Sequence, residues 1–160
     1  MGRKITKSTD WAYIAGFLDG DGSIMVQVKN RPSSTIGFRL MFTICFYQDS
    51  RHRKPLEWIR RKIEIGYLSD RCDKITELKI NGYKQVKRIL EKIQPFVKFK
   101  KRQTEIALKI LFLIGDKNFV SLSRKIRLKI ANLVCELRNE NYFSAKRKYS
   151  DREIKKMLGF

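Results

Sequence analysis

The sequence predicts an α+β fold: one antiparallel four-stranded sheet with helices on one face, followed by C-terminal helices. Three observations predict it. The hydrophobic spacing changes from a helical period to a period of two at Ser23, two hairpin patterns follow, and a helical pattern comes after each hairpin. The element order is therefore αββαββα. No low-complexity segment divides the 160 residues, so we expect a single domain over 1–160, with its core at about 10–114 and a helical extension over 115–160.

The first predicted element is a helix over about 10–18. Ser8, Thr9 and Asp10 are suitable N-cap residues, and the chain is expected to leave the helix at Gly20 and Gly22. Apolar residues at helical spacing mark its buried side. They are Trp11, Ile14, Ala15 and Leu18.

A long hairpin follows, with strands over about 23–31 and 38–47 and the turn signal RPSSTIG between them. Side chains alternate between the two faces of a strand. The apolar set expected to face the core is Ile24, Val26, Val28, Phe38, Leu40, Phe42, Ile44 and Phe46. The intervening residues are mostly polar, so the hairpin has one apolar and one polar face.

A second helix followed by a second, shorter hairpin comes next in the chain. Pro55 suits the first turn of a helix that ends near Gly66. A shorter hairpin comes next, and its Leu68, Leu78 and Ile80 are expected to face the core.

Helices complete the chain. Asn81 is expected to cap a helix that ends at Pro95, because the residue before a proline is disfavoured in the α region. Two more helices are predicted over 102–114 and 122–138, and a short one follows the capping box that begins at Ser150.

Charge is the strongest compositional signal. The chain has 36 Lys and Arg residues against 16 Asp and Glu residues, a formal net charge of +20. Such an excess favours a polyanionic partner, most often nucleic acid, over an anionic membrane surface. No apolar run is long enough to span a membrane, and the N-terminus lacks the apolar core of a signal peptide. We therefore expect a soluble intracellular protein, in the cytoplasm or in an organelle of a eukaryote.

The cysteine and histidine content excludes several kinds of site. Cys45, Cys72 and Cys135 are widely spaced, which argues against a disulfide framework and against a CxxC zinc pair. His52 is the only histidine, which excludes zinc fingers and HEXXH hydrolases. Ser-His-Asp or Cys-His catalysis would need more partners than this lone histidine easily supplies. Any catalysis must therefore use carboxylates and lysines.

Two acidic residues end the first helix, in the stretch IAGFLDGDG that runs from Ile14 to Gly22. Asp19 and Asp21 lie where a helix carries partial negative charge, which is unfavourable by about 0.3 to 1 kcal/mol each. The pattern fits either an Asx-type turn before a strand or a site where Mg²⁺ bridges carboxylates and phosphate oxygens. An EF-hand is excluded because the positions that need Gly and Glu hold other residues.

Small residues form a stripe along the same helix: Ala12, Ala15, Gly16 and Gly20. They lie at spacings of three and four, and small side chains at such spacing permit the close approach of another helix. The stripe fits either contact with the helix of a second copy or tight packing on the chain's own core.

The stretch IAGFLDGDG resembles the LAGLIDADG motif of homing endonucleases, and its single occurrence resembles the homodimeric, intron-encoded branch. The likeness extends from about Trp11 to Ile114 through the order of elements, the GYLSDR hairpin and the segment QPFVKFKKRQ. The region after about residue 115 is similar only in being helical and basic. The resemblance implies the LAGLIDADG homing-endonuclease fold, with two motif helices packed side by side across a two-fold axis.

The resemblance also implies roles for the acidic pair. Asp21 matches the catalytic, metal-binding carboxylate, and the Gly20 carbonyl is expected to contact the same Mg²⁺ ion, for which Mn²⁺ or Ca²⁺ is expected to substitute in binding. Asp19 matches the first acid, which is expected to cap or brace the partner's motif helix. The implied dimer interface consists of Ala12, Ala15, Gly16, Asp19 and Gly20.

Two further positions complete the implied catalytic set. Gln48 matches the polar residue that orients the attacking water, and Lys100 matches the basic residue that stabilises the transition state. The choice among the neighbouring basic residues is open, since three others lie close in sequence: Lys98, Lys101 and Arg102.

His52 occupies a supporting position where the dimeric branch can carry a basic residue. A histidine donates there only when protonated or in the right tautomer. We therefore expect Arg51 or Arg53, which flank it, to supply the positive charge. The alternative for all three is a solvated basic loop that contacts phosphates.

The polar strand faces form the second implied functional surface. A nine-residue strand spans about 30 Å at 3.3 Å per residue, enough to follow roughly nine base pairs, and a two-stranded ribbon fits the major groove. The expected DNA contacts are Met25, Gln27, Lys29, Arg31, Arg39, Met41, Thr43, Cys45, Ser69, Arg71, Glu77 and Lys79, with Tyr47 near the centre. The alternative is an ordinary solvent face. Basic residues of the C-terminal region are expected to contact phosphates or solvent: Arg124, Lys125, Arg127, Lys129, Lys146, Arg147 and Lys148.

Together with the charge, the resemblance implies a sequence-specific double-strand DNA homing endonuclease. A homodimer would recognise a long pseudo-palindromic site, hydrolyse both strands with a divalent metal to leave staggered 3′ overhangs, and promote intron mobility. No membrane partner and no small-molecule cofactor beyond the metal are expected. Two alternatives stay open: an RNA-splicing maturase or cleavage-inactive nucleic-acid-binding relative, and a basic structural RNA-binding protein, which would be monomeric and independent of metal.

Overall fold

The computed structural model describes residues 7–32, 37–141 and 149–160. Its elements follow the predicted order, αββαββα with further helices after it. In chain order they are α1 (Ser8–Asp21), β1 (Gly22–Asn30), β2 (Phe38–Asp49), the 3-10 turn η1 (Ser50–His52), α2 (Lys54–Ile63), β3 (Tyr67–Asp70), β4 (Ile75–Asn81), α3 (Tyr83–Ile93), α4 (Lys101–Ile114), the 3-10 turn η2 (Phe119–Ser121), α5 (Arg124–Glu140) and α6 (Asp151–Met157).

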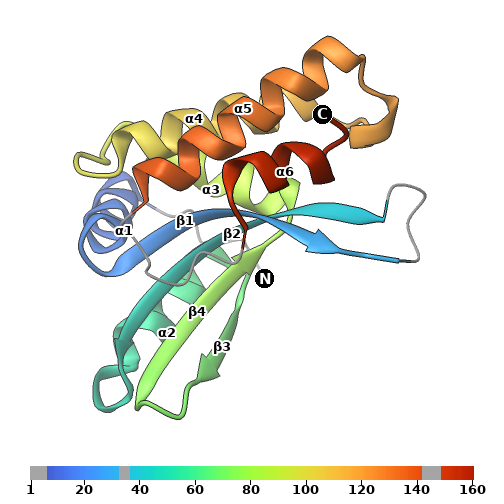
Figure 1. Ribbon diagram of the computed structural model, residues 1–160. Helices are drawn as coiled ribbons and strands as arrows, with labels where there is room; N and C mark the ends of the chain where they lie inside the picture. The colour runs from blue at the N-terminus through green and yellow to red at the C-terminus, as the bar shows by residue number, and fades with distance from the viewer. Residues whose placement is uncertain (1–6, 33–36, 142–148) are drawn as a thin grey trace.

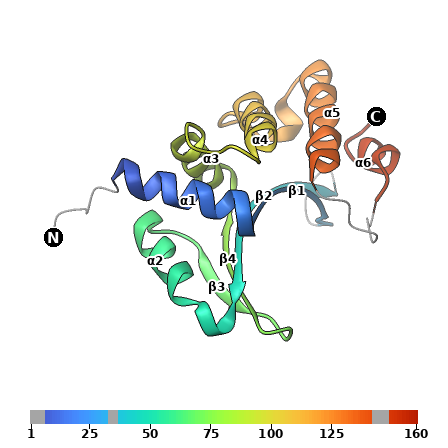
Figure 2. The same cartoon turned by 90° about the vertical axis from the view of Figure 1, so that its left-hand side faces the viewer.

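The four strands form one antiparallel sheet in the order β1-β2-β4-β3. β2 is the long central strand, and its Ile44 lies opposite Ile24 of β1 and Ile80 of β4. Helices cover one face of the sheet, and the opposite face is open and curved (Figures 1 and 2). The predicted fold class is therefore confirmed.

The period of two in the long hairpin is also confirmed. Every even-numbered residue from Ile24 to Val28 and from Phe38 to Phe46 is buried. These side chains share one core with Ile14 and Leu18 of α1, which are fully buried. This core fixes the strand register, because a slip of one residue would turn the whole apolar set toward solvent.

The end of α1 differs from the prediction. The helix continues to Asp21, so Gly20 lies inside it and Gly22 is its C-cap. A Cβ atom at Gly22 would lie 2.5 Å from Cδ1 of Leu18 and 2.9 Å from the Leu18 backbone. The immediate change from helix to strand therefore requires a residue without a side chain.

Asn81 does not cap α3, contrary to the prediction. The N-cap is Gly82, whose φ of 104° suits glycine. The Asn81 side chain lies on the open face of the sheet, where it accepts a 2.6 Å hydrogen bond from the Thr43 hydroxyl and donates one to the Tyr67 hydroxyl. The last residue of β4, Asn81, and the N-cap of α3, Gly82, are adjacent in the sequence. Residue propensities could not distinguish which of the two caps the helix.

The C-terminal helices pack on the rest of the fold. α5 lies beside α4 and the edge strand β1, and the Asn141 side chain donates a 3.0 Å hydrogen bond to the Ile24 carbonyl. The predicted capping box of Ser150 and Glu153 is present at α6. Lys146, Arg147 and Lys148, which were among the expected phosphate contacts, lie outside the described residues. Within the part of the chain that the structure describes, no helix is both long and apolar enough to cross a membrane.

Candidate active site

The acidic end of α1 carries an exposed carboxylate. Asp21 is the last helical residue, and both it and Gly20 are exposed. The last turn has no basic residue, although the final carbonyl groups of a helix carry partial negative charge. This end of α1 is therefore better suited to binding a cation than to stabilising the helix.

Asp19 makes its contacts within its own chain. Its carboxylate accepts hydrogen bonds from three consecutive backbone N–H groups that lead into α4: Lys98 at 2.6 Å, Phe99 at 3.1 Å and Lys100 at 2.9 Å. Asp19 therefore ties the segment that precedes α4 to the end of α1 in the same chain, while α4 itself begins without a side-chain cap. The motif resemblance implied instead that this acid caps or braces the partner's motif helix.

Lys100 lies against the acidic end of α1. It is only 6% exposed, and its Nζ donates a 2.6 Å hydrogen bond to the Asp19 carbonyl. Burial lowers the pKa of the Lys100 ammonium group, and the Asp19 and Asp21 carboxylates act in the opposite direction. Four basic residues were left open by the sequence, and among them the Lys100 side chain is the one that contacts the end of α1. Lys98 and Lys101 are exposed, and Arg102 pairs with Glu136.

Gln48 lies at the same end of the sheet as the acidic pair. Gly22, the first residue of β1, is opposite Phe46, so Gln48 lies two residues beyond the start of β1. Its even number places it on the side of β2 that the helices cover. Gln48 is half-buried, and its Oε1 accepts a 2.9 Å hydrogen bond from the backbone N–H of Asp49.

The flanking arginines are paired with carboxylates of the same chain. Arg51 donates to both carboxylate oxygens of Asp49, at 3.0 and 2.9 Å, and these bonds hold the pKa of the Asp49 carboxyl well below its usual range. Arg53 pairs with one carboxylate from α2 and one from β3. The expectation that an arginine supplies the supporting charge is therefore weakened, while His52 between them is exposed in η1.

The small-residue stripe divides between the core and the surface. Ala15 is fully buried in the chain's own core, so its expected place in a dimer interface is wrong. Gly16 and Gly20 are exposed, and a Cβ atom built on either would meet nothing within 4 Å. Ala12 is half-buried. The bare side of α1 is therefore the line through Gly16 and Gly20.

Two large apolar side chains beside this bare side were not predicted as functional. Tyr13, one helical turn before Gly16, is 54% exposed, and Phe99, whose backbone N–H donates to Asp19, is 84% exposed. The Tyr13 ring packs edge-on against Trp58 of α2 at 5.3 Å between centroids. An open hollow of about 410 Å³ lies there, between α1 and the start of α2. The sequence feature that could have identified Tyr13 and Phe99 is that both are large apolar residues outside the predicted core positions.

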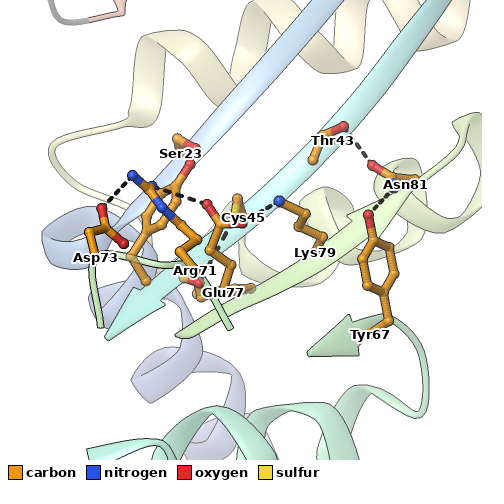
Figure 3. Close-up of polar contacts among 11 residues, drawn as sticks. Ser23, Thr43, Cys45, Tyr67, Arg71, Asp73, Glu77, Lys79 and Asn81 are labelled. Atoms are coloured by element: carbon orange, nitrogen blue, oxygen red, sulfur yellow. Dashed lines mark hydrogen bonds and ion pairs between the residues drawn. The ribbon is translucent and has the colours of Figure 1, made fainter. Parts of the chain in front are cut away.

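Most of the expected DNA-contact set lies on the open face of the sheet or at its edges with exposed or half-buried side chains. These residues are Met25, Gln27, Lys29, Arg31, Arg39, Met41, Ser69, Arg71 and Lys79. Three members are buried instead: Thr43 is 4% exposed, Cys45 0% and Glu77 6%. Figure 3 shows the longer side chains of Arg71 and Lys79 next to Cys45 and Glu77 on this face. The expectation that these three contact DNA directly is therefore wrong for the chain as folded.

The burial of Cys45 leads to a prediction about thiol reactivity. Cys72 is exposed, whereas Cys45 and Cys135 are buried, and burial raises the pKa of the Cys45 thiol to about 11. We expect one thiol, Cys72, to react rapidly with a disulfide reagent at mildly alkaline pH, and the other two to react only after unfolding. Reaction of Cys45 in the native protein, detected by peptide mass spectrometry, would contradict the buried placement.

Comparison with known proteins agrees with this geometry. Residues 14–110 match the sequence profile of the family described as LAGLIDADG endonuclease, a stretch that contains the α1 motif, both hairpins and Lys100. The chain belongs to the LAGLIDADG endonuclease family. Similar LAGLIDADG endonucleases include DNA endonuclease I-CreI of Chlamydomonas reinhardtii, 34% identical over 99 residues, or 62% of this chain and 60% of that protein. DNA endonuclease I-CvuI of Chlorella vulgaris is 26% identical over 101 residues, or 63% of each chain.

Solved LAGLIDADG structures extend the likeness beyond these aligned stretches, which span less than two thirds of either relative's length. The homing endonuclease I-CvuI in complex with its target has a TM-score of 0.83 at 20% identity, covering 94% of this chain and 93% of that one. The archaeal intron-encoded homing endonuclease I-Vdi141I complexed with DNA has a TM-score of 0.77 at 21% identity, covering 94% of each chain. At such identities the match confirms the fold over most of the chain.

Proposed function

We propose that this chain acts as a homodimeric, divalent-metal-dependent DNA endonuclease that cuts both strands of a long pseudo-palindromic site and leaves staggered 3′ overhangs. One observation carries the proposal: a single helix, α1, presents both the bare line through Gly16 and Gly20 and the exposed carboxylate of Asp21. When two such helices pack along their bare lines, two copies of Asp21 come together. Two nearby carboxylates suit the cleavage of two strands, and the relatives named above are DNA endonucleases.

The residues at the end of α1 fit a divalent cation, and Mg²⁺ is the ion we propose. Asp21 supplies an exposed carboxylate, and the end of the helix adds negative potential. Within residues 7–32, 37–141 and 149–160, no group of three or more His, Cys, Asp or Glu side chains is placed to hold a metal. The remaining ligands would be phosphate oxygens, water and the second Asp21. A bound metal would supply an acidified water and neutralise charge on the phosphate.

The chain's own residues have distinct roles in this proposal. Asp21 holds the metal, with the Gly20 carbonyl beside it. The Lys100 ammonium group is held in place by its hydrogen bond to the Asp19 carbonyl. From this fixed position it donates toward the negative charge that develops on the phosphate. Gln48 uses the N–H donors of its amide to order water near the phosphate. Asp19 touches no substrate in this scheme and acts by fixing the turn that carries Lys100.

The open sheet face has the dimensions and charge for DNA. β1 has nine residues and β2 twelve, so each spans about 30 to 40 Å at 3.3 Å per residue. The +20 charge of each chain is doubled in a dimer, which favours binding to the phosphate backbone and predicts affinity that falls steeply with salt.

The decisive experiment is cleavage of a plasmid that carries the uninterrupted insertion site of the intron or coding sequence in which this chain is encoded. We expect the protein to linearise this plasmid with Mg²⁺, to leave it intact with a chelator, and to ignore a plasmid in which the insert already divides the site. DNA binding without cleavage under any divalent metal would refute the enzyme and point to the inactive or RNA-splicing relative.

Gly16 offers a separate test of the dimer. Replacing Gly16 by Leu adds a side chain to the bare line without any clash inside the chain, and it removes a glycine that costs a helix about 1 kcal/mol. We expect the variant to remain folded but to elute as a monomer in size-exclusion chromatography and to lose cleavage. The control is Lys92→Leu, on the exposed side of α3. An unchanged dimer in Gly16→Leu would place the interface elsewhere.

A further inference from the structure

A carboxylate lies buried in the middle of the open, cationic sheet face. The Glu77 side chain, on β4, is only 8% exposed, yet it points to the same side of the sheet as the expected DNA contacts (Figure 3). Its Oε1 accepts a 3.2 Å hydrogen bond from Nη1 of Arg71, and its Oε2 pairs with the ammonium group of Lys79. Both oxygens are therefore occupied, which explains how a buried charge is tolerated.

Arg71 is held from two sides. Its Nη2 donates a 2.6 Å hydrogen bond to Asp73 in the β3–β4 turn, while its Nη1 reaches Glu77. A guanidinium has five N–H donors in a rigid plane, so two bonds leave three donors. The Arg71 side chain is still 47% exposed. It is thus both fixed in place and accessible from the open side of the sheet.

The charges of this cluster cancel. Arg71 and Lys79 contribute two positive charges, and Asp73 and Glu77 contribute two negative charges. A neutral cluster adds little to the general attraction for phosphates, which depends on net positive charge. What it presents to DNA is a set of N–H donors at fixed positions. In the major groove guanine offers two acceptors, N7 and O6, whereas no other base offers more than one.

We propose that Glu77 is a positioning residue that makes Arg71 a fixed reader of one guanine in each half-site. The inference rests on the proposed endonuclease function and names the base that this part of the sheet selects. Glu77 acts through Arg71 and touches no base itself. Lys79, on the other side of the carboxylate, adds a second donor next to the same base.

The test is the base preference at every position of the site. It is obtained by selecting cleaved molecules from a randomised duplex DNA library with Mg²⁺ for the wild type, Glu77→Gln and Arg71→Lys. We expect the wild type to select guanine at one position per half-site. Both variants should lose this preference by roughly tenfold, the size of one bidentate contact, and keep their preferences elsewhere. Arg71→Lys retains the charge but lacks the planar fork.

The matched control is Glu91→Gln, a carboxylate exposed on α3 that pairs with Lys87, and it should leave the profile unchanged. An identical profile for Glu77→Gln and wild type would overturn the proposal. So would a loss of preference at all positions together with a lower melting temperature, which is the signature of a structural role.

Repeating the selection on bound rather than cleaved DNA separates this inference from the proposed function. A Glu77-dependent guanine preference without any cleavage would support the positioning role and refute the endonuclease. Absence of any selected DNA would refute both.

Discussion

Replacing Asp21 by Asn is expected to abolish DNA cleavage, by roughly 10³-fold or more, while making the fold slightly more stable. The amide keeps the size of the side chain but removes the charge that would hold the metal. The same charge is unfavourable at the C-terminal end of α1, whose last turn has no basic residue, and Lys100 of the segment that precedes α4 offsets part of this cost. Removing the charge should therefore stabilise the helix slightly, by no more than about 0.3 to 1 kcal/mol.

Two measurements check this pair of effects. Plasmid cleavage with Mg²⁺ reports the loss of activity, and thermal unfolding at matched protein concentration reports the gain in stability. The control is Asp116→Asn, an exposed carboxylate after α4 that pairs with an exposed lysine; it should change neither quantity much. Cleavage at the wild-type rate by Asp21→Asn would remove this residue from the active site.

Replacing Asp19 by Ala is expected to have the largest effect on stability, a loss of about 2 to 4 kcal/mol. The substitution leaves the three backbone N–H groups at 98–100 without their acceptor. A hydrogen bond to a charged group contributes about 1.5 to 3 kcal/mol net, and the three losses do not add in full because Lys98 and Phe99 are exposed to water. Asp19→Asn, which retains one acceptor oxygen, should lose less. Denaturant unfolding of the two variants measures the order.

The monomeric Gly16→Leu background makes the Asp19 experiment decisive. If Asp19 acts through its bonds to residues 98–100 of its own chain, Asp19→Ala should destabilise the monomer as much as it destabilises the dimer. If Asp19 instead braces a partner's motif helix, the cost should vanish in the monomer. In either background Lys100 should lose its fixed position, so the variant should also cut DNA more slowly even where it remains folded.

The sequence predicted the structure best where a hydrophobic period along the chain corresponds directly to the face of a helix or strand. A period of two has only two faces to assign, and so the apolar residues of β1 and β2 were placed correctly from Ile24 to Phe46. Proline at the first turn of α2 and the capping box of α6 were also read correctly, because each acts on backbone groups a few residues away. The motif at the end of α1 could be recognised for the same reason, since its residues are contiguous.

Tertiary structure decided everything that depends on neighbours distant in the chain. Sequence spacing placed Ala15 and Gly16 on one stripe of small residues. It could not show that Ala15 is buried where α1 packs on α3 and the sheet, while Gly16 stays exposed. Alternation placed Glu77 on the polar face but could not show that two cations from other positions enclose it. Asp19 and Asp21 are two residues apart and chemically identical, yet only one meets the start of α4, about 80 residues later. Sequence period specifies the direction in which a side chain points, whereas its role depends on what the folded chain places there.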